Sequence, residues 1–359
     1  MHICQMTNGM MYGDAVSNHV IEIDKILKSW GHETDIFSGY IAPEMTKRVR
    51  PDHEYLSYVN NPNVWLIFHY SVYNPNISLF QRTKGKRILI YHNITPPHFF
   101  KGWDEKIYFE CDLGYRALSH LSECDFAWGD SEFNRQALLE AGFESSKTGV
   151  LPIILSDTYY ESLSHNDDLD TKLQYSQQTI WLAVGRVVPN KGLDDIIRLF
   201  YVYNRAINAQ SHLYIVGSRY ISTFNAALDK LVTELNLQND VTFTGRVTDS
   251  ELITYYQNAD MYVTASHHEG FCIPLIESMY FGVPILARKN TAIPETLGGA
   301  GILFTDLGYH VVAEMAHLLV TDIELRQHVI QTQKNRLKDF SFSNAESILR
   351  DVLEKLVSA

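Results

Sequence analysis

The residues best suited to chemistry in this 359-residue chain are two glutamates, Glu269 and Glu277, in the segment HHEGFCIPLIE. The segment follows MYVTAS, an apolar run typical of a buried parallel strand. Gly270 lets the backbone approach a ligand, and Pro274 is favoured near a helix start, so we expect a helix with Glu277 in its first turn. Such a helix start presents unpaired amide groups to an anion. Since Glu269 lies in the loop before this helix, both carboxylates can face the same cleft.

Two basic residues end another expected strand, in the segment VGRVVPNKG. Arg186 can fork onto phosphate oxygens, and Lys191 supplies a compact positive charge. Such a pair suits a departing diphosphate, on which negative charge develops. An Arg and a Lys five positions apart in a loop are more often plain surface charges, so this interpretation depends on the glutamates that follow along the chain.

Together the two segments resemble the GR…KG and EX7E motifs of glycosyltransferase family 4, part of the glycosyl transferases group 1. The resemblance implies that Glu269 lies by the donor sugar, that Glu277 holds the ribose hydroxyls, and that Arg186 and Lys191 contact the leaving diphosphate. It is strong over residues 184–294 and covers most of the chain at the level of the fold. For Glu277 alone, the structural alternative is an acid placed near a helix N-terminus by the dipole.

The resemblance also assigns residues around the nucleotide and the donor sugar. These are Gly270, Phe271, Cys272 and Ile273 before the expected helix, and Gly217, Arg246 and Val247 where the main chain passes the base and phosphates.

Further candidates lie in the first half of the chain. Gly13 and Asp14 separate an expected strand from a helix and resemble the loop over the donor phosphates; an ordinary strand-to-helix turn is the alternative. His92 ends the strand in YHNITPP and by resemblance lies near the reacting sugar, with a local hydrogen bond as its alternative. Ser131 and Asn134 resemble a family helix start but equally fit a plain N-cap.

The sequence indicates no metal and no cofactor. The four cysteines have neither a CxxC nor a metal-ligand spacing. Asp168-Leu169-Asp170 has the Asp-x-Asp form by which unrelated transferases bind a metal, but it lies in a polar connector and not at a strand end. The pair His267-His268 is likewise not expected to bind metal.

Alternating apolar runs and helical patterns predict an α/β fold with parallel sheets. A polar, aperiodic stretch separates two such series. The resemblance implies the GT-B fold, two Rossmann-like doubly wound domains facing across a cleft. The expected divisions are residues 1–155 as the acceptor-side domain, 156–178 as a linker, 179–340 as the nucleotide-sugar donor domain, and 341–359 as a helix that crosses back to the first domain.

The bulk composition excludes several classes of protein. A net charge of −12 argues against a nucleic-acid-binding protein, because that affinity comes largely from basic residues. The start MHICQMTNG lacks the features of a signal peptide, and no apolar run is long enough for a membrane helix. We therefore expect a cytoplasmic protein, with peripheral contact to the inner face of a membrane left open; the oligomeric state is not indicated.

The resemblance implies a retaining hexosyltransferase that uses a nucleoside diphosphate sugar. UDP-glucose is the favoured donor, with GDP-mannose as an alternative, and the acceptor is a glycan or a lipid-linked intermediate of polysaccharide biosynthesis. Rival interpretations are a GT-B sugar phosphorylase, a nucleotide-sugar epimerase and a non-catalytic protein that binds sugar nucleotides.

Overall fold

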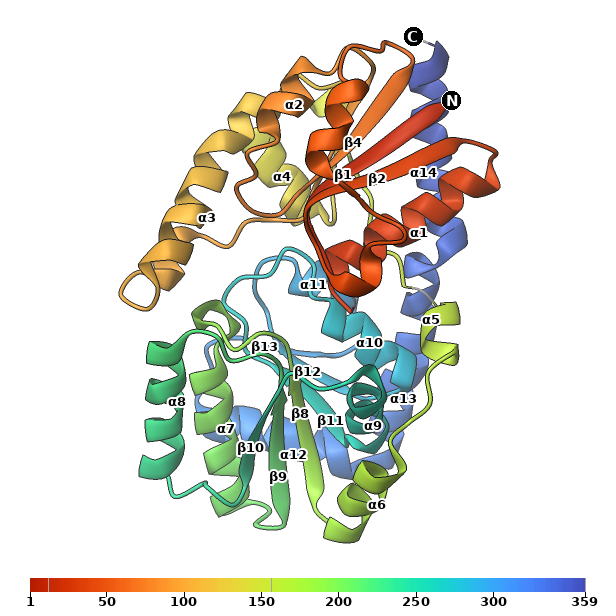
Figure 1. The fold of residues 1–359 in the computed structure, drawn as a ribbon. Coiled ribbons are helices and arrows are strands. Elements are labelled where there is room, and N and C mark those ends of the chain that lie inside the picture. The colour runs from red at the N-terminus through yellow and green to blue at the C-terminus, as the bar shows by residue number, and fades with distance from the viewer. Residues whose placement is uncertain (12, 156, 359) are drawn as a thin grey trace. The chain divides into compact units, whose positions relative to one another are not determined.

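The computed structural model describes residues 1–11, 13–155 and 157–358. Contacts divide the chain into two compact units. Unit 1 comprises Met1–His98, Lys106–Ser156 and Phe340–Ala359, and unit 2 comprises Phe99–Glu105 and Asp157–Asp339. Each unit contains one parallel sheet with its own helices (Figure 1). The expected α/β class with two doubly wound sheets is confirmed.

The sheet of unit 1 has seven strands in the order β3-β2-β1-β4-β5-β6-β7, and neighbouring strands run parallel. The strands are β1 (His2–Met10), β2 (Glu33–Ile41), β3 (Arg50–Pro51), β4 (Val64–Tyr70), β5 (Arg87–Tyr91), β6 (Phe126–Gly129) and β7 (Thr148–Val150). All seven residues of β4 are buried, which explains why its sequence VWLIFHY does not alternate.

Five α-helices accompany this sheet: α1 (Ala15–Ser29), α2 (Ile77–Arg82), α3 (Glu105–Ala117), α4 (Glu132–Glu140) and α14 (Phe342–Ser358). Helix α1 follows from apolar residues at helical spacing, of which Val20, Ile23 and Leu27 are fully buried. Ser131 caps α4 by accepting a hydrogen bond from the amide of Asn134, as the structural alternative for this pair predicts.

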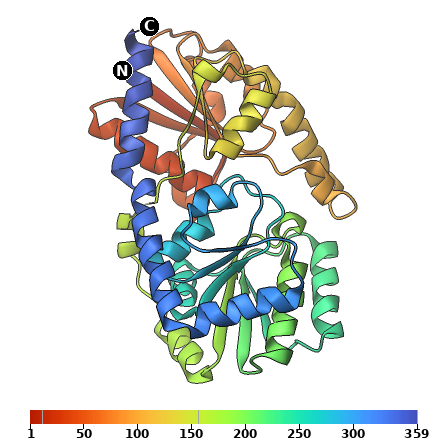
Figure 2. The same ribbon diagram turned by 180° about the vertical axis from the view of Figure 1, so that it is seen from behind.

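The C-terminal helix α14 belongs to unit 1, although residues of unit 2 precede it in the chain. Figure 2 shows it alongside the strands of this unit. Its apolar face, with Leu349 and Leu353, joins the same buried cluster as Ile3 of β1. At the edge of that cluster the indole of Trp30 donates a hydrogen bond to Glu346, with an N–O distance of 2.8 Å. The last helix thus completes the core of the first unit.

Unit 2 has six strands in the order β10-β9-β8-β11-β12-β13, again all parallel. They are β8 (Thr179–Val184), β9 (Ser211–Val216), β10 (Val241–Gly245), β11 (Met261–Thr264), β12 (Ile285–Arg288) and β13 (Ile302–Phe304). The helices are α5 (Asp157–Glu161), α6 (Asp167–Ser176), α7 (Leu193–Ala206), α8 (Ser222–Glu234), α9 (Asp249–Asn258), α10 (Ile273–Phe281), α11 (Ile293–Leu297), α12 (Tyr309–Thr321) and α13 (Ile323–Arg336).

The strand order reverses direction between β8 and β11 in unit 2 and between β1 and β4 in unit 1. In open parallel sheets, ligands bind at the carboxyl ends of the strands on either side of such a reversal. The loops that follow β8 and β11 are therefore the first place to look for a site.

Two features of the fold differ from expectation. The connector over residues 156–178 is largely helical, since it contains α5 and α6, and Asn166 caps α6 by accepting a hydrogen bond from the amide of Leu169. Strands β2 and β3 were not expected from the sequence. They lie toward one edge of their sheet, where β2 is only partly buried and therefore carries a weak apolar pattern.

None of the helices in the described part of the chain combines the length and apolar character that a membrane-spanning segment needs.

The packing of α14 makes a first prediction. Leu349 is fully buried, so Leu349→Ala should lower the free energy of unfolding of unit 1 by about 2–5 kcal/mol through lost burial and a residual cavity. Val357→Ala is the matched control, because Val357 lies on the same helix with 58% of its surface exposed, and it should change stability by less than about 0.5 kcal/mol. Denaturant unfolding followed by circular dichroism measures both, and equal effects would contradict the docking of α14.

Candidate functional site

The loops after β8 and β11 touch each other at the reversal of the strand order in unit 2. Gly192, directly before α7, has a φ of 60°, and a Cβ there would lie 2.2 Å from the carbonyl oxygen of Ala265. Gly217, after β9, has a φ of 152°, and its Cβ would lie 1.9 Å from the carbonyl oxygen of Gly185. Only glycine fits at either position, so the residue types at these strand ends bring the loops into contact.

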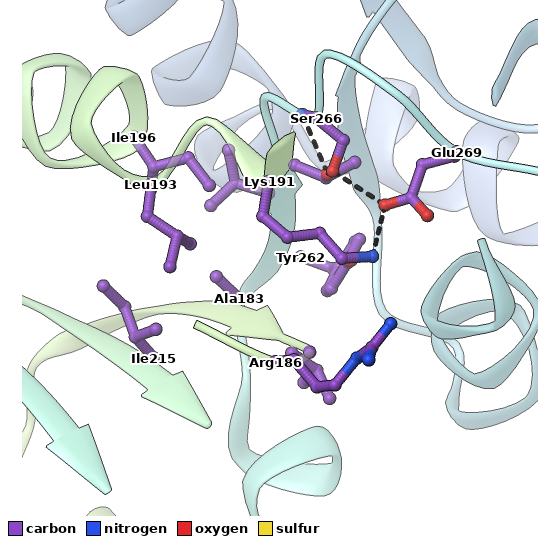
Figure 3. A pocket seen from close by; sticks show the side chains of 13 residues that line it. Ala183, Arg186, Lys191, Leu193, Ile196, Ile215, Tyr262, Ser266 and Glu269 are labelled. Atoms are coloured by element: carbon purple, nitrogen blue, oxygen red, sulfur yellow. Dashed lines mark hydrogen bonds and ion pairs between the residues drawn. The ribbon is translucent and has the colours of Figure 1, made fainter. Parts of the chain in front are cut away.

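A salt bridge joins the two loops. Lys191 Nζ lies 2.6 Å from Glu269 Oε1, and the same oxygen accepts a hydrogen bond of 2.8 Å from the hydroxyl of Ser266. The amide of Glu269 donates to Thr291 Oγ1, which fixes the backbone behind the carboxylate. Figure 3 shows the lysine reaching from one loop to the glutamate of the other. Three of the expected donor-site residues, Arg186, Lys191 and Glu269, line the same pocket.

Arg186 differs from Lys191 in having no partner. It is exposed, and no hydrogen bond or ion pair joins it to any residue that the structure describes. In Figure 3 its guanidinium group extends to the same side as the ammonium group of Lys191. A free guanidinium beside a paired lysine provides a positive site whose five N–H donors are available to an anion.

Asn190 fastens the loop after β11 further. Its side-chain amide donates to the backbone carbonyl of His268, and its backbone carbonyl accepts a hydrogen bond from the backbone amide of His267. On the other side, the Asn290 side chain donates to the carbonyl of His267. The main chain around Glu269 is therefore held from both directions.

The backbone before α10 is unusual at Cys272. This residue has a φ of 75° and a ψ of 71°, a left-handed conformation that costs free energy for any residue but glycine. Burial raises the pKa of its thiol well above the usual range, and the carboxylate of Glu269 adds to this effect. Ile273 is the first residue of α10, and the carbonyl of Phe271 accepts a hydrogen bond from Thr296.

Glu277 lies in the second turn of α10 and not in the first, which corrects the expectation from the sequence. The helix begins at Ile273, directly after the left-handed residue, so Glu277 is its fifth member. A favourable interaction with the first turn of the helix therefore does not account for this carboxylate. It does not line the pocket formed by Lys191 and Glu269.

Two tyrosines hold the carboxylate of Glu277. The hydroxyl of Tyr160 on α5 donates to Oε1 at 2.8 Å, and the hydroxyl of Tyr256 on α9 donates to Oε2 at 2.7 Å. Burial raises the pKa of Glu277, and the two hydrogen bonds oppose that shift. Neither tyrosine belongs to a motif that the sequence reveals.

A network of charges surrounds Asp195 on α7, beside this site. Asp195 Oδ2 lies 2.5 Å from Arg288 NH2 and 3.4 Å from His267 Nε2, and Oδ1 accepts a hydrogen bond from Tyr309. The hydrogen bond to His267 is the largest of several causes that lower the pKa of Asp195 to about 2. His267 is thus a partner of Asp195.

The remaining residues expected near the nucleotide lie at the ends of β9 and β10. Gly217 donates its amide to the carbonyl of Gly245, and Arg246 and Val247 follow directly after β10. Arg246 is exposed and Val247 is half-buried. Gly270 lies in the loop between Glu269 and α10.

Two candidate residues of unit 1, Gly13 and Asp14, form the turn that leads into helix α1. Asp14 is the N-cap of α1, where Oδ2 accepts hydrogen bonds from both the amide and the hydroxyl of Ser17. Gly13 precedes it with a φ of 72°. These contacts match the ordinary strand-to-helix turn that the sequence left open, and the assignment of both residues to the donor stays a prediction.

His92 is buried, with only 1% of its side chain exposed, and both ring nitrogens are engaged. Nε2 lies 2.9 Å from His69 Nδ1, and Nδ1 lies 3.0 Å from Asp130 Oδ2. Asp130 follows β6, and burial raises the pKa of its carboxyl group. In this conformation neither nitrogen is available to a substrate. The structure therefore contains the local hydrogen bonds that were the alternative interpretation of His92. Its catalytic assignment stays a prediction.

A continuous series of hydrogen bonds leads from the carbonyl of Val20 through Gln5 and His69 to His92. Gln5 donates its amide to the carbonyl of Val20, so its oxygen accepts from His69 Nε2. Neutral His69 can then only accept at Nδ1, which requires a proton on His92 Nε2. Asp130 Oδ2 is the partner of His92 Nδ1 at the end of this series.

Among the described residues, one group has the spacing of metal ligands: His2, Cys4 and Asp35, at the amino ends of β1 and β2. His2 Nε2 lies 3.0 Å from Asp35 Oδ2, and Arg50 NH1 lies 3.2 Å from Asp35 Oδ1. The arginine already balances the carboxylate. Asp168 and Asp170, the Asp-x-Asp candidate, fall in the first turn of α6, where Asp170 accepts hydrogen bonds from Gln174 and Asn258.

Comparison with known proteins finds one family that matches a large part of unit 2. Residues 166–336 match the family described as glycosyl transferases group 1. The match covers just under half of the chain. The group 1 segment contains Arg186, Lys191, Glu269 and Glu277, the four residues on which the resemblance in the sequence rests.

Two curated relatives are similar over parts of their length. O-antigen chain mannosyltransferase B of Escherichia coli is 26% identical over 48% of this chain and 45% of its own. O-antigen chain mannosyltransferase RfbU of Salmonella typhimurium is 24% identical over 72% of this chain and 66% of its own. The matched parts thus span less than two thirds of either relative.

Solved structures share the fold along the whole chain. Anabaena Alr3699/HepE in complex with UDP and glucose superposes with a TM-score of 0.76 at 15% identity, covering 99% of this chain and 100% of that one. Similar folds at this identity support the GT-B architecture for the chain and nothing finer.

The Asp195 network leads to a prediction about pH. Its carboxylate has a folded pKa of about 2 against an ordinary value of 3.8, so it contributes about 2 kcal/mol of stability above pH 5, and this contribution is lost as the pH falls from about 5 toward 2. Asp195→Asn should therefore lower the free energy of unfolding at pH 7 by about that amount. The difference in free energy between wild type and the variant should become smaller as the pH falls. Urea unfolding of both proteins between pH 7 and pH 3 measures it.

Asp306→Asn is the matched control, because Asp306 contacts the same arginine but its side chain is 93% exposed. An exposed ion pair contributes less than about 1 kcal/mol. If both substitutions had the same cost at every pH, the assignment of the low pKa to Asp195 would be wrong.

Proposed function

We propose that this protein is a retaining glycosyltransferase that moves a hexose from a nucleoside diphosphate sugar to a glycan or lipid-linked acceptor in polysaccharide biosynthesis. The observation that carries the proposal is the arrangement at the carboxyl ends of β8 and β11. There an unpaired Arg186 lies beside the Lys191–Glu269 salt bridge in one pocket of a group 1 segment.

The chemistry of the pocket fits a departing diphosphate. In the transfer, the bond between the anomeric carbon and the phosphate oxygen breaks, and a bond from that carbon to the acceptor oxygen forms on the same face of the sugar. The acceptor proton goes to the leaving phosphate oxygen. Arg186 and Lys191 stabilise the negative charge that grows on the diphosphate, and Glu269 faces the sugar, on which positive charge develops.

The charges present make a metal unnecessary for this step, since two cationic side chains already face the expected diphosphate. We therefore propose that the reaction uses no metal and no other cofactor. Transfer activity that disappears with a chelator and returns with a divalent cation would contradict this part of the proposal.

The donor sugar is the finer part of the proposal. The names of both curated relatives specify mannosyl transfer, which favours GDP-mannose. UDP-glucose is the second candidate, supported by the nucleotide and sugar bound in the similar Anabaena fold. The relatives' names also support an acceptor that is part of a growing surface polysaccharide.

A panel of ligands tests the donor. UDP, GDP, UDP-glucose and GDP-mannose are each added to the protein, and thermal unfolding is recorded. A ligand that binds only the folded state at about 100 times its Kd stabilises that state by about 2.7 kcal/mol, so one nucleotide and its sugar should raise the Tm. No shift with any of the four would contradict the proposed function.

The two basic residues should respond differently to substitution. Arg186→Ala should reduce kcat/KM for the sugar nucleotide that binds by about 100–1,000-fold, because it removes a hydrogen-bond donor to the developing charge. It should leave the Tm nearly unchanged, because the Arg186 side chain is exposed and makes no hydrogen bond or ion pair with any described residue. Lys191→Ala should reduce both kcat/KM and stability, since Glu269 then loses its cation.

Arg198→Ala is the control for charge alone, because Arg198 is exposed on α7 and does not line the pocket. It should retain nearly full activity. If Arg186→Ala and Arg198→Ala had equal activity, Arg186 would have no role in the reaction.

A further inference from the structure

Glu277 is an unusual carboxylate because it is partly removed from water and has no cation. No hydrogen bond or ion pair joins it to a basic side chain in the described part of the chain; its two recorded partners are the phenols of Tyr160 and Tyr256. A buried charge without such partners is costly, and groups of this kind concentrate at functional sites. The two tyrosines are therefore what makes an ionised Glu277 tolerable.

The two phenols occupy only half of the hydrogen-bond acceptor positions of the Glu277 carboxylate. Each oxygen has two lone-pair positions and accepts one phenol, so one position per oxygen remains. Two parallel acceptors of this kind match two adjacent hydroxyl groups on one ring. They match a single hydroxyl or a phosphate less well, because a phosphate would be repelled by the carboxylate.

We propose that Tyr160 and Tyr256 are positioning residues that hold the carboxylate of Glu277 ionised and oriented, so that its two remaining acceptor positions receive the vicinal hydroxyls of the donor ribose. This inference rests on the proposed function and extends it to two residues on other helices. The tyrosines act through Glu277 and do not themselves touch the reacting atoms.

The surroundings of the two phenols show why they can hold a fixed position. Tyr256 on α9 is 1% exposed and its ring stacks on Phe281, with centroids 5.3 Å apart. The ring of Tyr160 packs against Tyr280 and Phe281 at the end of α10, with centroids 5.1 and 5.8 Å away. Both hydroxyls are thus anchored by aromatic packing, which lowers the entropy lost when they bind the carboxylate.

The ionisable groups around Glu277 set the direction of the pH effect. Besides the two phenols they include Tyr262 on β11 and the carboxylate of Asp249 at the start of α9. Asp249 raises the pKa of Glu277, as burial does, and the phenols lower it. Loss of a phenol should therefore move the acidic limit of nucleotide binding to higher pH, because Glu277 must be ionised to accept two hydroxyls.

The test is a cycle between a tyrosine and one ribose hydroxyl. UDP and 2′-deoxy-UDP are titrated into wild-type protein, Tyr256→Phe and Tyr160→Phe by calorimetry, with GDP and 2′-deoxy-GDP used if the protein binds guanine nucleotides. Each substitution should weaken binding of the ribonucleotide about tenfold, as expected for a lost hydrogen bond to a charged group. The penalty for removing the 2′-hydroxyl should be smaller in each variant than in wild type, since the tyrosine and the hydroxyl act on the same carboxylate.

Tyr255→Phe and Tyr159→Phe are the matched controls. Tyr255 is buried on α9 next to Tyr256 and has no contact with Glu277, and Tyr159 on α5 donates to Asp249. Both controls should bind the two nucleotides as wild type does. They distinguish the effect of removing any tyrosine hydroxyl from the effect of removing the hydroxyls of Tyr160 and Tyr256.

The outcomes distinguish this inference from the proposed function. If wild-type protein binds neither UDP nor GDP, the proposed function fails and this inference fails with it. If wild type binds a nucleotide but the penalty for the missing hydroxyl is the same in all variants, only the role of the tyrosines is overturned. Repeating the titrations from pH 5 to pH 8 gives a second readout, in which the acidic limit should shift in Tyr256→Phe and Tyr160→Phe alone.

Discussion

The salt bridge between Lys191 and Glu269 is the interaction on which the arrangement of the candidate site depends. It spans two loops that are 78 residues apart in the chain, and it is short, at 2.6 Å. The loops approach closely enough to form it because Gly192 has no side chain where the main chain of Ala265 passes. Asn190 then binds the same loop through both its side chain and its backbone. The carboxylate and the ammonium group are therefore held in fixed positions, which is what the proposed electrostatic stabilisation of a transition state requires.

Three acidic side chains of unit 2 are stabilised in three different ways. Glu269 has a lysine and a serine hydroxyl, Asp195 has an arginine and a histidine, and Glu277 has two phenols. A cation neutralises a carboxylate, whereas a phenol leaves its charge intact and occupies one acceptor position. Glu277 is therefore the one of the three with no cation among its hydrogen-bond partners, which suits its proposed role as an acceptor for neutral hydroxyl groups, while the unpaired Arg186 suits the proposed binding of an anion. A nucleoside diphosphate sugar carries both kinds of group in one molecule.

The sequence predicted those parts of the site that are consecutive in the chain. Strand ends, glycines and charged residues within residues 184–192 and 267–277 could be recognised because each segment contains its own strand, loop and helix start. Tyr160 could not be recognised, since it lies 117 residues from Glu277 and no spacing rule links them. The position of Glu277 within α10 could not be predicted either, because the left-handed conformation of Cys272 decides where the helix begins. Strand β2, second from the edge of its sheet, is only partly buried and lacks the apolar run that revealed the central strands.

The hydrogen bonds around His92 in unit 1 show why the type of residue at a strand end is weaker evidence of function than the bonds which that residue makes. His92 ends its strand as a ligand-binding residue would, yet its two nitrogens lie in a row that begins at the Val20 carbonyl and ends at Asp130. The first end is fixed by the backbone, which sets the proton positions on Gln5 and His69. Asp130 Oδ1 is buried and has no hydrogen-bond partner among the described residues. The series that engages both nitrogens of His92 therefore ends at a carboxylate with one oxygen still without a partner, and the position of His92 at a strand end gives no indication of this.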